Sequence, residues 1–148
     1  METKYNRNEF THEYTGEVKF SEVDSFNVVH NLAYLYWLEW ARTQYLFDIG
    51  MPRDDSIFSI RMPIMTVHSE VDYYNSMKFT DRYTVLTKVS KIGDSSITFI
   101  NQVYSDDKLI LEAKSILVYV DTKNGKPVTI PDFVREKINN YEKEWNQI

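Results

Sequence analysis

The chain has 148 residues, a length typical of one compact domain. Its 17 Lys and Arg residues against 22 Asp and Glu residues give a formal net charge of −5, which argues against a basic face for nucleic acid. Hydrophobic residues make up 43% of the chain and aromatic residues 15%, which supports a real core and excludes a disordered chain.

The first part of the chain combines a polar start with one short strand. Residues 1–12 are polar and contain no apolar run of signal-peptide length, so we expect a loose arm. No stretch reaches the roughly 20 apolar residues of a transmembrane helix, and we expect a cytoplasmic protein without a membrane partner. Val18 and Phe20 alternate with polar neighbours, which predicts a strand over residues 14–23.

A long helix follows. Asn31 is predicted to cap a helix over residues 32–49, with Gly50 as its C-terminal cap and Pro52 as its stop. Its first half is apolar on nearly every face, through Leu32, Ala33, Tyr34, Leu35, Tyr36, Trp37, Leu38, Trp40 and Ala41. Such a helix is normally buried by something that wraps it, and a curling sheet is the simplest solution.

The second half of the chain is predicted to form strands. After a loop at 51–61, runs rich in Val, Ile, Thr, Tyr and Phe predict strands at 63–74, 80–92, 96–105 and 109–121. Turn signals separate or end these runs at Gly93-Asp94, Asp106-Asp107 and Asn124-Gly125. Pro131 then opens an amphipathic helix that presents Phe133, Val134, Ile138 and Tyr141 at helical spacing.

This order predicts an α+β fold in one domain over residues 1–148, with a long central helix wrapped by a five-stranded antiparallel sheet and a short C-terminal helix. Five strands cannot close into a barrel around such a helix, so one sheet edge is expected to stay open. Pairing of edge strands between two chains would remove it. We therefore expect a homodimer, and whether dimers join into a homotetramer stays open.

One segment carries a motif. Asp24 ends the first predicted strand, the helix opens about seven residues later with Tyr34 soon after its start, and Glu39-Trp-Ala-Arg42 follows. This arrangement resembles the hot-dog fold acyl-CoA thioesterases of the 4-hydroxybenzoyl-CoA thioesterase type. That family usually has glycine just after the Asp, where this chain has Phe26 and Asn27. Asn tolerates a left-handed backbone, so the turn is expected to survive.

The resemblance implies that the protein hydrolyses an acyl-CoA to a free acid and CoA, with no cofactor beyond the CoA of the substrate and no metal. It implies that Asp24 acts as nucleophile or general base and that the backbone N–H of Asn31 polarises the thioester carbonyl. Helix N-terminal N–H groups and the helix dipole suit a developing oxyanion independently of the resemblance. The residues alone also allow a structural role for Asp24, because an Asp between strand and helix commonly caps a turn.

His30 leaves a second kind of enzyme open. It either assists chemistry at the helix start or simply hydrogen-bonds in the loop, and an Asp24–His30 pair would fit a hydratase or dehydratase. A binding module that holds an acyl-CoA without cleaving it stays open as well, and so does a thioesterase that acts on an acyl carrier protein. Glu39 and Arg42 are expected to pair with each other on the helix.

Residue types that are scarce narrow the chemistry further. The absence of Cys excludes disulfides, thiolate zinc sites and cysteine nucleophiles. With four glycines and no GxGxxG or GxxxxGK[ST] run, a nucleotide-binding loop is not expected.

Overall fold

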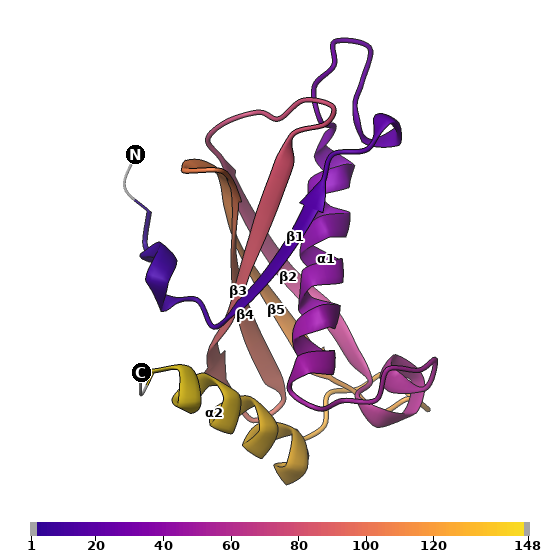
Figure 1. Cartoon of the computed structure of the whole chain (residues 1–148). Helices are drawn as coiled ribbons and strands as arrows, with labels where there is room; N and C mark the ends of the chain where they lie inside the picture. Colours follow the sequence, from indigo (N-terminus) through magenta and orange to yellow (C-terminus); the bar gives the residue numbers. More distant parts are fainter. Residues whose placement is uncertain (1–2, 147–148) are drawn as a thin grey trace.

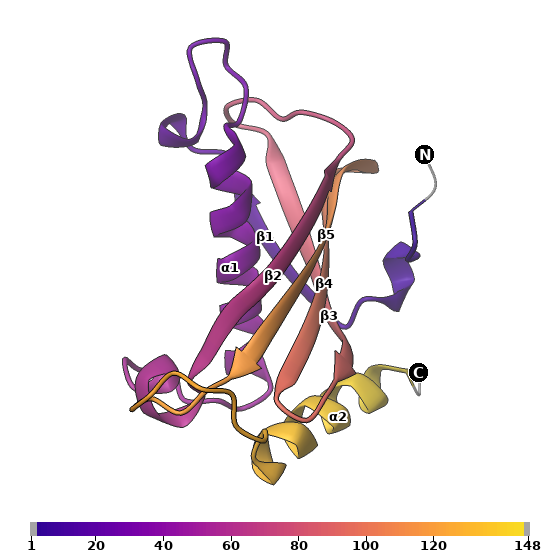
Figure 2. The same ribbon diagram turned by 180° about the vertical axis from the view of Figure 1, so that it is seen from behind.

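A computed structural model describes residues 3–146 and shows one antiparallel sheet with a long helix along it (Figure 1). The sheet has the order β1-β3-β4-β5-β2. Its strands are β1 (His12–Glu17), β2 (Ile64–Tyr73), β3 (Arg82–Ile92), β4 (Ser96–Ser105) and β5 (Lys108–Tyr119). The helices are α1 (Asn31–Asp48), which runs the length of the sheet, and α2 (Asp132–Asn146), which crosses one end of it (Figure 2). The predicted α+β architecture is confirmed.

The predicted turns lie where the sheet needs them. β3, β4 and β5 form two consecutive hairpins, joined at Gly93-Asp94 and at Asp106-Asp107. Asp106 takes the left-handed conformation with φ +53°, and Gly50 takes φ +106° just after α1. β2 returns to pair with β5, which leaves β1 and β2 as the two edges of the sheet.

The sheet wraps α1 on one side, and the opposite side of the helix stays exposed in this chain. The helix packs mainly against β3 and β1. Its buried side chains are Ala33, Tyr34, Trp37, Leu38, Ala41, Thr43, Tyr45 and Leu46. Four of its large apolar side chains stay exposed, at Leu32, Leu35, Tyr36 and Trp40. No helix in the described part of the chain is long and apolar enough to cross a membrane.

The N-terminal segment is anchored, so the expectation of a loose arm over residues 1–12 is wrong for its later part. Phe10 is 3% exposed and packs with Leu86 and Ile100. Gln102 donates a hydrogen bond to the Tyr5 carbonyl oxygen at 2.9 Å. The burial of one aromatic side chain therefore holds residues that look polar in sequence.

The first strand ends earlier than predicted, at Glu17 rather than near Val23. Val18 turns away from the ladder and exchanges hydrogen bonds with the segment before β3: its N–H donates to Asp81 at 2.8 Å, and its carbonyl accepts from Thr80 at 3.2 Å. Residues 20–22 form a 3₁₀ turn. In the loop predicted over 51–61, residues 57–61 form a short helical turn.

Glu142 ties α2 to the rest of the fold. Glu142 Oε1 accepts hydrogen bonds from the Tyr45 hydroxyl at 2.7 Å, the Val89 N–H at 2.7 Å and the Thr11 hydroxyl at 3.2 Å. Burial raises the pKa of Glu142 above its usual value, although these donors oppose the shift. On the same helix Val134 and Ile138 are buried as predicted, whereas Phe133 is 47% exposed and does not join the core.

We predict that the Glu142→Gln variant loses a pH dependence of stability. The pKa of Glu142 is higher in the folded state than in the unfolded chain, so as the pH rises the unfolded chain releases this proton first. The contribution of Glu142 to the free energy of unfolding is therefore fully present below the unfolded-state pKa. It is lost as the pH rises through the folded-state pKa. Urea unfolding of both proteins from pH 4 to pH 8 should therefore show wild type losing stability relative to the variant. A constant difference across this range would contradict the prediction.

Candidate active site

The segment between β1 and α1 folds into a loop that the side chain of Asp24 closes. The Asp24 N–H donates to the Val28 carbonyl at 2.9 Å, and Asp24 Oδ1 accepts the N–H groups of Phe26 at 2.9 Å and Val28 at 3.2 Å. Asp24 Oδ2 has no hydrogen-bond partner within residues 3–146. One carboxylate oxygen thus caps a turn, as the structural role predicts, and the second oxygen is available to water or substrate.

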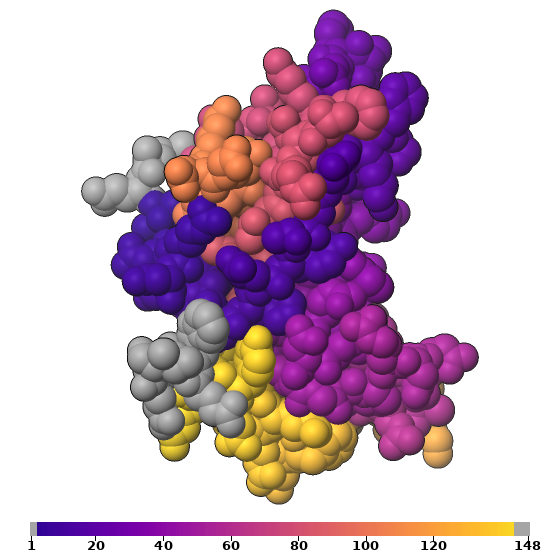
Figure 3. All heavy atoms as spheres, viewed as in Figure 1, coloured from indigo at the N-terminus to yellow at the C-terminus, as the bar shows by residue number. Residues whose placement is uncertain are grey.

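Asn27 supplies the left-handed residue predicted in place of glycine. Its φ is +58°, and its side-chain Oδ1 accepts the N–H of Phe79 at 3.1 Å. Phe20 and Phe79 also meet edge to face, with ring centroids 5.6 Å apart. In Figure 3 the loop lies at one tip of the molecule beside the segment that precedes β3. The loop is therefore held against that segment from two points.

α1 begins one residue earlier than predicted, and His30 rather than Asn31 is its cap. His30 Nδ1 accepts the Ala33 N–H at 3.2 Å, and His30 Nε2 lies 3.3 Å from the Ser21 carbonyl oxygen. A neutral imidazole with its proton on Nε2 satisfies both contacts. Because both ring nitrogens are engaged within the loop, the structure gives His30 a structural role.

Asn31, the first residue of α1, stands at a hollow between the helix start and the end of β2. The hollow has a volume of about 480 Å³ and is lined by Val28, Val29, Asn31, Tyr34, Tyr73, Tyr74, Asn75 and Ser76. The Tyr73 hydroxyl donates to Asn31 Oδ1, and burial raises the pKa of Tyr73, which keeps it a neutral donor. The backbone N–H groups of Asn31 and Leu32 have no acceptor in the described part of the chain. They are available to a developing oxyanion.

The two predicted site residues lie in one loop–helix unit, but only one of them reaches this hollow. Asn31 lines it, together with Val28 and Val29 of the loop, whereas Asp24 is not among the lining residues. A site that uses both Asp24 and Asn31 therefore needs additional residues, from outside this loop, to enclose the substrate. Among residues 3–146, no group of three His, Cys, Asp or Glu side chains is placed to hold a metal ion.

Sequence reasoning missed the support of this loop by Glu22. Its Oε1 accepts the Lys19 N–H at 2.8 Å, its Oε2 accepts the indole N–H of Trp37 at 2.6 Å, and its backbone carbonyl accepts the His30 N–H at 3.0 Å. Trp37 is itself stacked on Tyr83, with centroids 3.8 Å apart. The hydrogen bond between Trp37 of α1 and Glu22 joins residues 15 positions apart in the sequence, and no local sequence pattern predicts it.

We predict that Glu22→Gln lowers kcat for the thioester hydrolysis that the resemblance implies by roughly 10- to 100-fold, since small displacements of reacting groups have effects of this size. The amide of Gln has one oxygen that accepts hydrogen bonds where the Glu22 carboxylate has two. The Asp24 loop therefore loses either the hydrogen bond from the Lys19 N–H or the one from the Trp37 indole. Hydrogen exchange of the loop amides should become faster in the same variant. Glu17→Gln is the matched control, because within residues 3–146 the Glu17 side chain makes only a 3.9 Å pair with Arg82. Equal effects of the two variants would refute the positioning role.

Comparisons with known proteins converge on one family. The family model described as the thioesterase-like superfamily matches residues 18–138. The chain is 25% identical over 118 residues to the acyl-CoA thioesterase YbgC of Haemophilus influenzae, covering 80% of this chain and 87% of that protein. It is 28% identical over 128 residues to the chloroplastic acyl-acyl carrier protein thioesterase ATL3 of Arabidopsis thaliana, covering 85% and 66% respectively.

A solved structure shares the fold. The thioesterase of Thermus thermophilus, crystallised with coenzyme A and Zn, superposes with a TM-score of 0.79 at 23% identity, and the match covers 90% of this chain and 96% of that one. At this identity the likeness establishes the hot-dog architecture.

Proposed function

The chain belongs to the thioesterase-like superfamily, and from this we propose that it is an acyl-CoA thioesterase, which hydrolyses an acyl-CoA to a free acid and CoA. The observation that carries the proposal is the arrangement of one unit: within the described residues, one carboxylate oxygen of Asp24 has no partner, and the N–H groups of Asn31 and Leu32 at the following helix start have no acceptor. The names of the YbgC and ATL3 relatives support the same reaction class.

Two routes fit these groups. As general base, Asp24 removes a proton from water while the water oxygen attacks the thioester carbon, and the C–S bond then breaks as the CoA sulfur takes up a proton. As nucleophile, the Asp24 carboxylate attacks the same carbon, the C–S bond breaks, and CoA leaves as a thiolate that takes up a proton; water then hydrolyses the resulting anhydride to the free acid and restores the Asp24 carboxylate. In both routes negative charge grows on the carbonyl oxygen, where the Asn31 N–H and the N-terminal end of the α1 dipole stabilise it.

We propose that two copies of the chain form the active unit. β2 is an open edge strand, and its Met65 and Val67 are 54% and 61% exposed. Beside it, the uncovered side of α1 exposes Leu32, Leu35, Tyr36 and Trp40. Contiguous apolar surface next to an unpaired edge is typical of a self-association site. A second chain seated there supplies the wall that Asp24 lacks in its own chain.

Two competing functions have less support than acyl-CoA hydrolysis, each because of a particular observation. A hydratase with an Asp24–His30 pair needs a free imidazole, but both nitrogens of His30 are engaged in capping and in the loop. An acyl-carrier-protein substrate has the support of the ATL3 relative, whereas the net charge of −5 disfavours an acidic carrier. A single domain, a cytoplasmic location and a tetramer stay predictions.

Free-thiol release from a panel of aliphatic and aromatic acyl-CoAs tests the proposal. Turnover of at least one class is the expected result, and the preferred class identifies the acyl group. Tight acyl-CoA binding without turnover across the panel would contradict hydrolysis and favour a binding module.

A further inference from the structure

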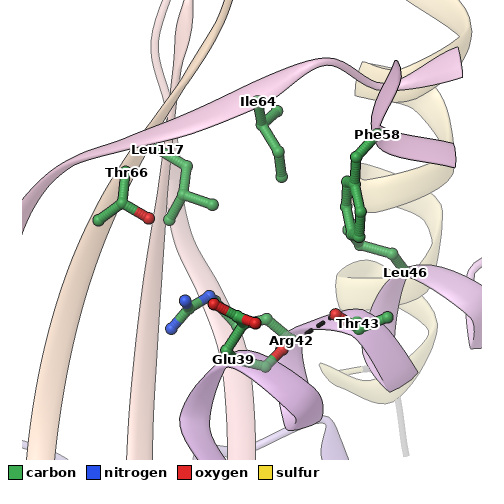
Figure 4. A pocket seen from close by; sticks show the side chains of 8 residues that line it. All are labelled: Glu39, Arg42, Thr43, Leu46, Phe58, Ile64, Thr66 and Leu117. Atoms are coloured by element: carbon green, nitrogen blue, oxygen red, sulfur yellow. Dashed lines mark hydrogen bonds between the residues drawn. The ribbon is translucent and has the colours of Figure 1, made fainter. Parts of the chain in front are cut away.

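A second cavity lies along α1, toward the other end of the helix from the Asp24 loop (Figure 4). It lies between α1, β2, β5 and the helical turn at residues 57–61, with a volume of about 250 Å³. Its walls are apolar at Leu46, Phe58, Ile64 and Leu117 and polar at Glu39, Arg42, Thr43 and Thr66. The volume lies below the usual range of whole-ligand pockets, so the cavity fits one part of a larger ligand.

Arg42 brings a positive charge into this cavity. Its only hydrogen bond within residues 3–146 is a long one, 3.5 Å from Nη1 to the Ser115 hydroxyl. The expected ion pair with Glu39 is not formed within the described residues, although Glu39 also lines the cavity and its carboxylate lies beside the guanidinium in Figure 4. Burial lowers the pKa of Arg42, and nearby Glu39 offsets part of that shift.

The charge of Arg42 is compensated only in part, by the nearby Glu39 carboxylate without an ion pair and by one long hydrogen bond. Removing a guanidinium from water is unfavourable unless an anion and good hydrogen bonds replace the water. Arg retains its charge under these conditions and presents a planar set of donors that matches a carboxylate. The cavity therefore combines walls for hydrocarbon with a cationic group for an anionic end.

The proposed dimer brings this cavity to the catalytic groups. An edge strand that pairs with its own copy about a two-fold axis runs antiparallel to it. Full-length pairing of β2 then places Ile64 of one chain beside Tyr73 of the second chain. Because Ile64 lines the Arg42 cavity and Tyr73 lines the Asn31 hollow, the cavity of one chain adjoins the hollow of its partner.

We propose that Arg42 selects acyl groups that end in a carboxylate, so that the preferred substrates are thioesters of dicarboxylic acids. The inference rests on the proposed thioesterase function and deepens it. The thioester lies at the Asn31 N–H of one chain, and the distal carboxylate of the acyl group binds Arg42 of the second chain. Glu39 weakens this binding by its like charge and sets its strength.

The test compares CoA thioesters of saturated dicarboxylic acids with those of monocarboxylic acids of the same chain length, over a series of lengths. Wild type should prefer the dicarboxylic thioester at one length. Arg42→Gln should lower kcat/KM for it by about 10- to 100-fold, the worth of a hydrogen bond to a charged group. The neutral thioester should change less than about threefold, since it makes no such bond. Arg42→Lys should retain part of the preference.

Glu39→Gln provides a gain-of-function test that does not depend on the buried site tolerating substitution. This exposed residue should, when neutralised, strengthen the dicarboxylate preference. Calorimetric binding of the free dicarboxylic acid is measured in parallel. Binding that depends on Arg42 without any hydrolysis supports the anion site and contradicts the proposed function. Hydrolysis with no dicarboxylate preference at any length, unchanged in Glu39→Gln, overturns the Arg42 proposal alone.

Discussion

Asp24→Asn is expected to lower kcat for acyl-CoA hydrolysis by about 10²- to 10⁴-fold, the usual contribution of a positioned general base, and by at least as much if Asp24 is the nucleophile. The substitution removes the negative charge of Asp24 without removing the oxygen that caps the turn. An amide oxygen can accept the Phe26 and Val28 N–H groups that Asp24 Oδ1 accepts, so the loop should keep its shape. Thermal stability and acyl-CoA binding should therefore stay close to those of wild type.

Asp121→Asn is the matched control for this prediction. Asp121 is another loop aspartate whose Oδ1 accepts an N–H two residues ahead, from Lys123 at 2.7 Å. It lies in the turn after β5, away from the helix start. Its variant should retain wild-type turnover. Equal activity of the Asp24 variant and this control would reduce Asp24 to its turn-capping role.

The double variant Tyr36→Glu/Trp40→Glu is expected to yield a monomer without hydrolytic activity. Tyr36 and Trp40 are 68% and 45% exposed, one turn apart on the uncovered side of α1. In a two-fold dimer every introduced charge occurs twice in one interface, and like charges there oppose association by several kcal/mol, on the order of a 10³-fold weaker dimer. Sedimentation velocity and thiol release measured on the same samples check both halves of the prediction.

Phe133→Glu serves as the comparison for that variant. Phe133 is a similarly exposed aromatic residue, 47% accessible, but it lies on α2 rather than on the α1–β2 surface. Its substitution should leave both assembly and turnover unchanged. A fully active monomer of the α1 double variant would show that one chain alone completes the site.

The sequence predicts the elements of this fold well because their signals are local. The hairpins at Gly93-Asp94 and Asp106-Asp107 follow from turn chemistry, and the left-handed Asn27 follows from the tolerance of Asn for that conformation. The predicted start of the long helix is off by one residue, because His30 and Asn31 both have a side chain that can cap a helix. The Ser21 carbonyl, which holds the His30 ring, favours His30.

The features that the sequence does not predict depend on contacts between residues far apart in the chain. The bond from Trp37 to Glu22 and the burial of Phe10 against Leu86 form only once the sheet is assembled. Glu39 and Arg42 have a spacing that permits an ion pair, and both line the cavity beside α1, yet within the described residues their charged groups do not come within ion-pair distance. A side-chain direction of this kind follows from tertiary structure, not from spacing.

The most direct test of the account is a mass balance of acyl-CoA hydrolysis by wild type and Asp24→Asn side by side, with free thiol and free acid measured together. If the Asp24 carboxylate drives hydrolysis, wild type releases both products in equal amounts, with no metal added, and the variant binds the same acyl-CoA but releases almost none of either. Equal release by the two proteins, or release by neither across the acyl panel, would contradict the account.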